Sequence, residues 1–338
     1  MVNSAKRIVT IGASAGGLDA VRSLLAELPP DFSTPICIVI HMSSDSPGVM
    51  AQILDRSSRL RVASACDACR LQPGHVYVAP PDRHLLVEPG RVRLTKGPRE
   101  HGFRPAVDPL FRSAAQVYGP GAIGVVLTGN LDDGTAGLWT IKKLGGIAVV
   151  QDPAEALFPS MPRHALENVK ADHVVRLSQL APLLAELTTE APLARESVDV
   201  PEHINVEVNI AKEHNPREAG LEQMGTPSAY ACPDCHGVLL EFEEGGRVRF
   251  RCHIGHAYSV ESLLAALNEG VERAMSTAVR SLEEGRLLMD RVAVMLDRRD
   301  QREAAARLRT SSQRVKRKAE VMNQLMRESE TAVPTTDQ

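Results

Sequence analysis

Aromatic residues are scarce in this sequence: only 11 of its 338 residues are Phe, Tyr or Trp. A surface on which nucleic-acid bases stack needs several such side chains, so a base-stacking platform is not expected. The net charge of −3 also provides no basic field for a phosphate backbone. We therefore expect no nucleic-acid ligand.

Long apolar runs and a dense set of cysteines are also missing. No stretch approaches the roughly 18 consecutive apolar residues that span a bilayer, so we expect no membrane insertion. Six cysteines in a chain of this length do not make a disulfide scaffold. The basic and apolar residues near the start fit a strand that enters a Gly-rich turn better than they fit a signal peptide. We therefore expect a cytoplasmic protein with reduced thiols.

The first 190 residues alternate short apolar runs with segments of helical period. The apolar runs are Arg7–Ile11, Ile36–Ile40, His75–Ala79, Ala122–Leu127 and Ile147–Val150. The helical segments lie near residues 18–28, 47–56, 109–118, 134–144 and 162–168. Continuous apolar strands that alternate with helices are typical of a parallel sheet covered on both faces. The sequence therefore predicts an α/β fold with a doubly wound, mostly parallel sheet over residues 1–190.

Composition changes after this region. Residues 191–225 are rich in Glu, Pro, Ala and Asn, have little periodicity and are expected to form a linker. Residues 226–259 hold three cysteines in a compact segment. Residues 260–330 are almost free of proline and carry apolar residues at steps of three and four, which predicts a helical hairpin or coiled coil. We expect residues 331–338 to form a disordered tail.

A candidate nucleophile lies close to the start, in Gly12-Ala13-Ser14-Ala15-Gly16, between the first predicted strand and a helix. The pattern Gly-x-Ser-x-Gly in this context is typical of a serine nucleophile on a sharp turn. The N–H after the serine lies at a helix N-terminus, where it can stabilise an oxyanion. A plain Gly-rich turn and a phosphate-binding loop share the pattern. A dinucleotide site lacks its usual acidic residue, because His41 stands where an Asp or Glu should end the second strand.

Candidate partners for Ser14 follow other predicted strands. His41 comes directly after the second strand, and Asp132 and Asp133 follow the strand that ends at Leu127. The C-terminal ends of parallel strands share one edge of the sheet, where sites form in doubly wound folds. A serine, a base and an orienting carboxylate on that edge can form a Ser-His-Asp triad. Either aspartate could instead only cap the helix that follows it.

Residues 7–190 resemble the catalytic domain of the chemotaxis protein-glutamate methylesterases of the CheB type. The resemblance rests on segments in the same order: Ile11–Gly17, Ile40–Met42, Gln72–Pro80, Arg104–Phe111, Leu127–Gly129, Asp133-Gly134 and Met161–Arg163. It implies a CheB-type methylesterase fold in which Ser14 is the nucleophile, His41 the base and Asp133 the orienting acid. It also implies that the backbone N–H groups of Ala15 and Asn130 bind the oxyanion, and that catalysis needs no cofactor.

The resemblance further implies hydrolysis of glutamate γ-methyl esters, with release of methanol. The expected substrate is a methylated chemoreceptor or a related signalling protein, and glutamine deamidation is a plausible side activity. Family members usually carry Met-Gly where this chain has Asn130-Leu131, so the shape of this loop can differ. The familiar enzyme begins with a receiver domain, whereas only a few residues precede the first strand here, and we expect no control by phosphorylation in cis. The alternative is a non-catalytic chemosensory scaffold that acts through its C-terminal region.

A candidate metal site lies in residues 226–259. The segment Cys232-Pro-Asp-Cys235 is followed, after sixteen intervening residues, by Cys252-His253-Ile-Gly-His256. Thiolates and imidazoles at this spacing suit tetrahedral Zn²⁺, and the two runs between them predict a β-hairpin as in a zinc ribbon. We expect a structural zinc on Cys232, Cys235, Cys252 and His256, with His253 as the alternative fourth ligand. A reduced hairpin without metal is the other interpretation.

The other cysteines and the C-terminal helices carry weaker signals. Cys66 and Cys69 have no second ligand pair near them and are expected to be reduced structural thiols, while Cys37 lies within a strand. The basic run Arg314–Lys318 is more typical of a solvated helix face than of a nucleic-acid site. A candidate partner is a chemosensory protein that docks on the C-terminal helices.

Overall fold

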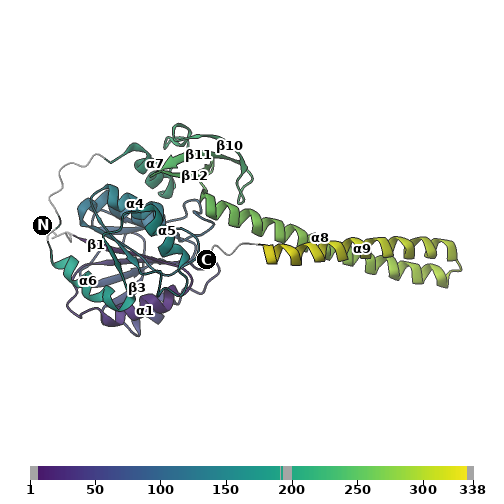
Figure 1. Cartoon of the computed structure of the whole chain (residues 1–338), viewed down its shortest axis with the longest axis horizontal. Helices are drawn as coiled ribbons and strands as arrows, with labels where there is room; N and C mark the ends of the chain where they lie inside the picture. The colour runs from purple at the N-terminus through teal and green to yellow at the C-terminus, as the bar shows by residue number, and fades with distance from the viewer. Residues whose placement is uncertain (1–6, 191, 193–199, 333–338) are drawn as a thin grey trace. The chain divides into compact units, whose positions relative to one another are not determined.

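The computed structural model describes residues 7–190, 192 and 200–332, with side chains described as far as residue 328. The chain divides into two compact units, residues 1–263 and 264–338. The first contains a seven-stranded sheet between layers of helices, and the second is a pair of long helices (Figure 1). None of the helices described is both long enough and apolar enough to cross a membrane.

The main sheet is entirely parallel, with the strand order β3-β4-β2-β1-β7-β8-β9. Its strands are β1 Ile8–Ala13, β2 Ile36–Ile40, β3 Arg61–Ser64, β4 His75–Val78, β7 Ala122–Val126, β8 Ile147–Gln151 and β9 His173–Val175. Every residue of β1, β2 and β7 is buried. Burial on both faces explains why these strands are continuous apolar runs in the sequence.

Helices cover both faces of this sheet. One hydrophobic core joins the sheet to α1 (Gly17–Glu27), α2 (Met50–Asp55) and α6 (Leu177–Thr189). A second core, on the opposite face, joins it to α3 (Val107–Tyr118), α4 (Thr135–Lys143) and α5 (Ser160–Asn168), and a short 3-10 helix, η1 (Gly119–Gly121), leads from α3 into β7. The predicted α/β fold with a doubly wound, parallel sheet is confirmed.

The two halves of the sheet meet at β1. β2 pairs with one side of β1 and β7 pairs with the other. The connections that leave these strands diverge at their C-terminal ends, which is where doubly wound sheets form a crevice. The loops after β1, β2 and β7 carry Ser14, His41 and Asp133, so the topology itself collects the predicted catalytic residues.

Two further elements pack on the outer side of α3. β5 (His84–Glu88) and β6 (Arg91–Thr95) form an antiparallel hairpin, and the Val87 N–H donates to Ser113 Oγ of α3 at 3.0 Å. Helix α7 (Glu202–Ala211) lies on α3 as well, where Gln116 Nε2 donates to Asn205 Oδ1 at 2.7 Å.

Helix α7 and a short 3-10 helix, η2 (Leu221–Gln223), fall within residues 191–225, which the sequence predicts to be a linker. The buried apolar residues of α7 are spaced by two: Ile204, Val206, Val208 and Ile210. That spacing is typical of a strand and conceals the helix, which is buried nearly all round. Even Glu207 is fully buried, because Arg251 neutralises its carboxylate.

Residues 226–259 form a separate antiparallel sheet, here called the ribbon, in the order β10-β11-β12-β13. Its strands are β10 Thr226–Ala231, β11 Val238–Glu244, β12 Arg247–Cys252 and β13 Ala257–Ser259. Gly245 and Gly246, with φ of 62° and 78°, form the turn between β11 and β12. These left-handed values explain the glycine pair at this turn.

Buried ion pairs join the ribbon to the α/β region. Arg251 of β12 pairs with Glu207 of α7 and with Glu100 at 2.9 Å, and Arg249 of the same strand pairs with Asp108 of α3 at 3.0 Å. All five side chains are at most 1% exposed. Buried charges are strongly destabilising unless they are paired, so we expect the ribbon and the α/β region to fold together.

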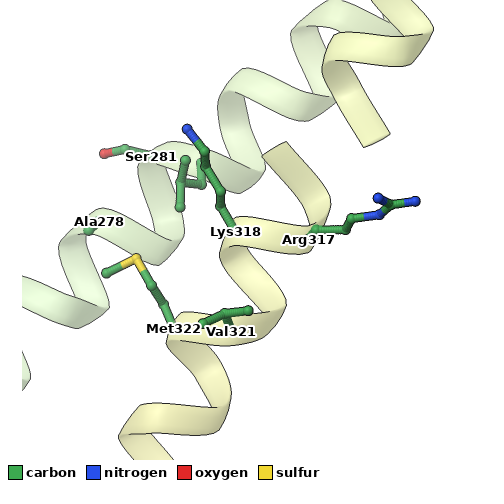
Figure 2. A pocket seen from close by; sticks show the side chains of 7 residues that line it. Ala278, Ser281, Arg317, Lys318, Val321 and Met322 are labelled. Atoms are coloured by element: carbon green, nitrogen blue, oxygen red, sulfur yellow. The ribbon is translucent and has the colours of Figure 1, made fainter. Parts of the chain in front are cut away.

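The second unit consists of α9 (Arg302–Ala332) and the greater part of α8 (Val260–Arg298), joined by a turn in which Asp300 has φ 56°. Small side chains lie buried between them: Ala293, Ala305, Ser312 and Ala319. Both helices line a groove of about 750 Å³. Figure 2 shows Ala278 on one side of it and Val321 and Met322 on the other. The predicted C-terminal helices are present; of the predicted tail over 331–338, residues 333–338 lie outside the described residues.

Candidate active site

Ser14, His41 and Asp133 form one hydrogen-bonded chain at the C-terminal edge of the main sheet. Ser14 Oγ lies 3.1 Å from His41 Nδ1, and His41 Nε2 lies 2.6 Å from Asp133 Oδ2. The side chains of His41 and Asp133 are 5% and 1% exposed. The structure thus brings together the three residues that the sequence nominates as nucleophile, base and acid.

Backbone contacts between the loops fix this arrangement. The Ser14 N–H donates to the Thr128 carbonyl at 3.0 Å, and the His41 N–H donates to the Ala13 carbonyl at 3.1 Å. A Cβ atom added to Gly129 would lie 2.8 Å from the Ser14 Cβ. Only glycine allows the loop after β7 to pass this close to the nucleophile.

The orientation of the His41 ring decides which nitrogen acts as the base. Nε2 faces Asp133, and because a carboxylate only accepts hydrogen bonds, Nε2 carries the hydrogen. Nδ1 then directs its lone pair at the Ser14 hydroxyl. The Phe103 ring stacks on His41 with centroids 3.9 Å apart and planes within 9°, which restrains the plane of the imidazole.

Asp133 is held by three backbone donors. Its Oδ2 accepts from the Val107 N–H at 2.7 Å, and its Oδ1 accepts from the N–H groups of Asp108 at 3.1 Å and Gly134 at 2.8 Å. Two of these donors belong to the first turn of α3, where helix N–H groups have no partner within the helix. These hydrogen bonds stabilise the negative charge of Asp133. They also hold Oδ2 toward His41 and Oδ1 toward the N–H groups of Asp108 and Gly134.

Asp132 has a different environment from Asp133. Its Oδ1 accepts from Ser259 Oγ of β13 at 2.7 Å, and its Oδ2 lies 4.0 Å from Arg247 Nη1. The free N–H of Gly137 at the N-terminus of α4 is capped by Asp108 Oδ1 at 2.6 Å, so capping of this helix explains neither Asp132 nor Asp133. The geometry selects Asp133 as the partner of His41.

The predicted oxyanion donors are available beside Ser14. Among the residues that the structure describes, the backbone N–H groups of Ala15 and Asn130 donate to no other group. Leu131 has φ 61°, a left-handed conformation that costs a residue other than glycine about 1 kcal/mol. The chain therefore keeps at Leu131 a backbone shape that the glycine usual at this position would adopt freely.

A pocket of about 360 Å³ opens beside His41. Its lining consists of Met42, Ser43, Ser44, Arg99, Gly102, Phe103 and Arg104. The Arg104 guanidinium already binds Asp82 at 2.6 Å and the Gly97 carbonyl at 2.9 Å, and its hydrogen bond lowers the pKa of Asp82. Arg104 thus shapes the pocket wall. No residue pattern had indicated Phe103 as part of this site.

The four residues expected to bind zinc also come together. Their ligand atoms, from Cys232, Cys235, Cys252 and His256, all lie within 4.8 Å of one another. The Cys252 Sγ lies 3.6 Å from the Cys235 Sγ and 3.5 Å from His256 Nδ1, and its pKa is lowered, chiefly by the hydrogen bond with Cys232. His253 is exposed and its ring packs against Gly237, so His256 and not His253 faces the three thiols.

A second cluster of metal-ligating side chains, Glu100, His101 and Asp108, has a different character. Arg112 pairs with Glu100 at 2.8 Å, and Arg249 pairs with Asp108 at 3.0 Å. Protein cations already neutralise these carboxylates, so the cluster does not call for a metal.

The remaining cysteines differ from one another. Cys66 and Cys69 form a disulfide, whereas the sequence suggested reduced thiols. Ala68, with φ 58°, closes the turn between them and leaves their Cα atoms 5.4 Å apart, within the range of disulfides. Cys37 is a buried thiol in β2, and burial raises its pKa.

Comparisons with known proteins agree with this geometry. A family model described as CheB methylesterase matches residues 9–184. A Leptospira interrogans protein of the protein-glutamate methylesterase/protein-glutamine glutaminase type is 41% identical over 180 residues, which cover 53% of this chain and 93% of that protein. A Yersinia pestis protein-glutamate methylesterase/protein-glutamine glutaminase is 39% identical over 191 residues, which cover 55% of this chain and 54% of that protein.

A solved structure extends the comparison to three dimensions. The CheB methylesterase catalytic domain of Thermotoga maritima is 36% identical to this chain, with a TM-score of 0.52 over 54% of this chain and 98% of that domain. The predicted resemblance and the prediction of a carboxylic ester hydrolase are confirmed. The chain belongs to the CheB methylesterase family.

Proposed function

We propose that this chain hydrolyses the γ-methyl esters of glutamate side chains in a protein, through an acyl-enzyme on Ser14. The observation that carries the proposal is the hydrogen-bonded chain from Ser14 through His41 to Asp133. This chain supplies a nucleophile, a base and an orienting acid in the order that acyl transfer requires.

In the first step, Ser14 Oγ attacks the ester carbonyl while His41 Nδ1 takes the hydroxyl proton. The resulting imidazolium keeps its Nε2–H on Asp133, whose negative charge stabilises it. The carbonyl oxygen becomes an oxyanion, and we assign its stabilisation to the N–H groups of Ala15 and Asn130.

The tetrahedral intermediate then expels methanol, which takes its proton from His41 Nδ1. Water enters, gives its proton to the same nitrogen and attacks the acyl-enzyme, and the glutamate carboxylate leaves as Ser14 recovers its proton. A glutamine side chain passes through the same kind of intermediate and would release ammonia. We therefore propose glutamine deamidation as a side activity, in line with the names of the relatives.

The substrate that we propose is a methylated chemoreceptor or a related signalling protein, in the cytoplasm. The pocket of about 360 Å³ beside His41 is large enough for one side chain and lies on the side where Phe103 covers the imidazole. A chemosensory partner on α8 and α9 remains our proposal for the C-terminal unit. The assembled triad argues against the alternative of a non-catalytic scaffold.

We further propose that Cys232, Cys235, Cys252 and His256 hold a structural Zn²⁺. Three thiols and one imidazole within 4.8 Å of one another match the donor set and the number of ligands of structural zinc sites. The metal would cross-link the turns at one end of the ribbon and would take no part in the ester chemistry. The catalytic steps above need no cofactor.

The test uses the full chain and a receptor that carries methyl-labelled glutamate esters, with release of labelled methanol as the readout. We expect release by the wild-type chain and none above background with Ser14→Ala. Ser276→Ala, which changes an exposed serine of α8, should release methanol like the wild type. Methanol release that survives Ser14→Ala would overturn the mechanism.

A further inference from the structure

We propose that His101 is a positioning residue of the esterase, which orients Asp133 toward His41, and that residues 257–262 of the C-terminal extension hold His101 in place. The proposal rests on the proposed role of Asp133 and adds to it a contact with the ribbon. Neither the sequence pattern nor the family resemblance points to His101.

The His101 side chain lies behind Asp133, on the side away from His41. It is 1% exposed, and its Nε2 is 3.1 Å from Asp108 Oδ2 and 3.7 Å from Asp133 Oδ1. Its Nδ1 is 3.0 Å from Ser262 Oγ and 3.7 Å from Asp132 Oδ1. One imidazole therefore contacts three aspartates and a serine hydroxyl in the interior.

The charges around His101 favour its cationic form. Burial by itself would lower the pKa of His101, but the hydrogen bond to Asp108 and the charges of Asp133 and Asp132 outweigh it and raise the pKa to about 9. Arg112 and Arg249 neutralise Asp108 from the other side, at 3.4 and 3.0 Å. His101 thus makes its direct hydrogen bond with Asp108, and its charge also acts on Asp132 and Asp133 at 3.7 Å.

The positive charge of His101 stabilises the orientation of the Asp133 carboxylate. Oδ2 faces His41 while Oδ1 faces His101, so the carboxylate lies between two imidazoles. Arg112 and Arg249 pair with Asp108, so without the His101 charge the repulsion that remains in this water-poor site is chiefly between Asp133 and Asp132. Such repulsion favours protonation or rotation of Asp133, and either change breaks the contact with His41.

The C-terminal extension determines where the His101 ring lies. The His101 N–H donates to the Ala257 carbonyl of β13 at 2.8 Å, and His101 has φ 54°, a left-handed value that such a contact can hold. Ser262 contacts the ring, and its Oγ is fixed in turn by the Ser259 N–H at 2.9 Å. Phe103, two residues after His101 in the same loop, stacks on His41.

The test measures two reactions of the full chain, as wild type and as His101→Gln and Ser262→Ala variants. The first is methanol release from the methylated receptor, and the second is the rate at which a fluorophosphonate labels Ser14. The second needs an activated serine but not the natural substrate, so it still tests His101 if the proposed substrate is wrong. His214→Gln and Ser276→Ala, which change exposed residues, are the matched controls.

For His101→Gln we expect kcat and the labelling rate to fall about 10- to 100-fold, since small displacements of a catalytic group have effects of this size. KM should change by less than about 2-fold. Loss of a nearby cation makes His41 and Asp133 easier to protonate, so the acidic limb of both pH profiles should move to higher pH. Ser262→Ala should change both rates in the same direction by a smaller factor.

A general loss of structure would lower the rates at every pH without moving the acidic limb. That outcome, or a His101→Gln variant with wild-type rates, would overturn the proposal, as would failure of the wild type to label at Ser14. If His101→Gln does not fold, the pH profile of Ser262→Ala decides, because that variant retains the imidazole and loses only its support.

Discussion

The Nε2 atom of His41 lies 2.6 Å from Asp133 Oδ2, and the opposite ring nitrogen faces the hydroxyl of Ser14. This relationship makes Nδ1 the base and Nε2 the nitrogen that remains protonated through the reaction. Catalysis therefore depends on a carboxylate that accepts at Nε2, and a variant can test this requirement without removing any atom of Ser14 or His41.

Asp133→Asn should reduce turnover by up to ~10⁴-fold with the fold intact. His41 Nε2 donates a hydrogen bond and needs an acceptor, whereas the amide of asparagine can present its NH₂ group instead. Asp132→Asn should have a much smaller effect, since the amide oxygen can still accept from Ser259. Methanol release is measured for both variants. The comparison requires that each variant unfolds at the same temperature as the wild type. Near-normal turnover by Asp133→Asn beside an inactive Asp132→Asn would show that the wrong carboxylate has been assigned.

The four-residue cluster of the ribbon predicts one zinc ion per chain. Cys252→Ser should lose the metal, because Cys252 lies within 3.6 Å of Cys235 and 3.5 Å of His256. His253→Ala is the matched control and should retain it, since His253 points away from the three thiols. Elemental analysis of the purified proteins measures the stoichiometry. A wild-type chain without zinc, or a His253→Ala variant that loses it, would contradict the assignment.

The buried ion pairs predict that the ribbon contributes to the stability of the α/β region. Glu207→Gln leaves Arg251 with one carboxylate fewer in a fully buried site and should lower the free energy of unfolding by about 3–5 kcal/mol. Glu202→Gln, an exposed change on the same helix, should cost less than about 0.5 kcal/mol. Urea unfolding measures both. Equal stability of the two variants would mean that α7 and the ribbon fold independently of the α/β region.

The charge on His101 also predicts how stability depends on pH. Its pKa in the folded chain is raised to about 9, above the ordinary value of about 6.5 for an unfolded chain. The stabilisation is therefore fully present below about pH 6.5 and is lost as the pH rises through about 9, with an upper limit of about 3 kcal/mol. Urea unfolding between pH 6 and pH 10 should show this decline in the wild type and in His214→Gln, and a flatter curve in His101→Gln. Parallel curves for all three proteins would count against a buried cation at His101.

Residue patterns were sufficient to predict those features of this protein that depend on residues close together in the sequence. Apolar strands alternating with helices predicted the parallel sheet, and Gly12–Gly16 predicted the turn that presents Ser14. The ends of three buried strands placed Ser14, His41 and the aspartates on one edge, because parallel strands all end there. The spacing of Cys232, Cys235, Cys252 and His256 predicted which side chains would meet.

Only the tertiary structure decided the rest, because the remaining contacts join residues far apart in sequence. The residue pattern left Asp132 and Asp133 open and the family resemblance favoured Asp133; the structure shows the physical difference, because one side chain points toward His41 and the other toward Ser259. Helix α7 was hidden because its apolar residues repeat every two positions, and a buried helix need not show one polar face. His101 and Phe103 have no pattern of their own. His101 lies behind Asp133 and Phe103 lies on His41 because of how their loop folds, and the ribbon holds that loop through Ala257. Such packing is a property of the folded chain.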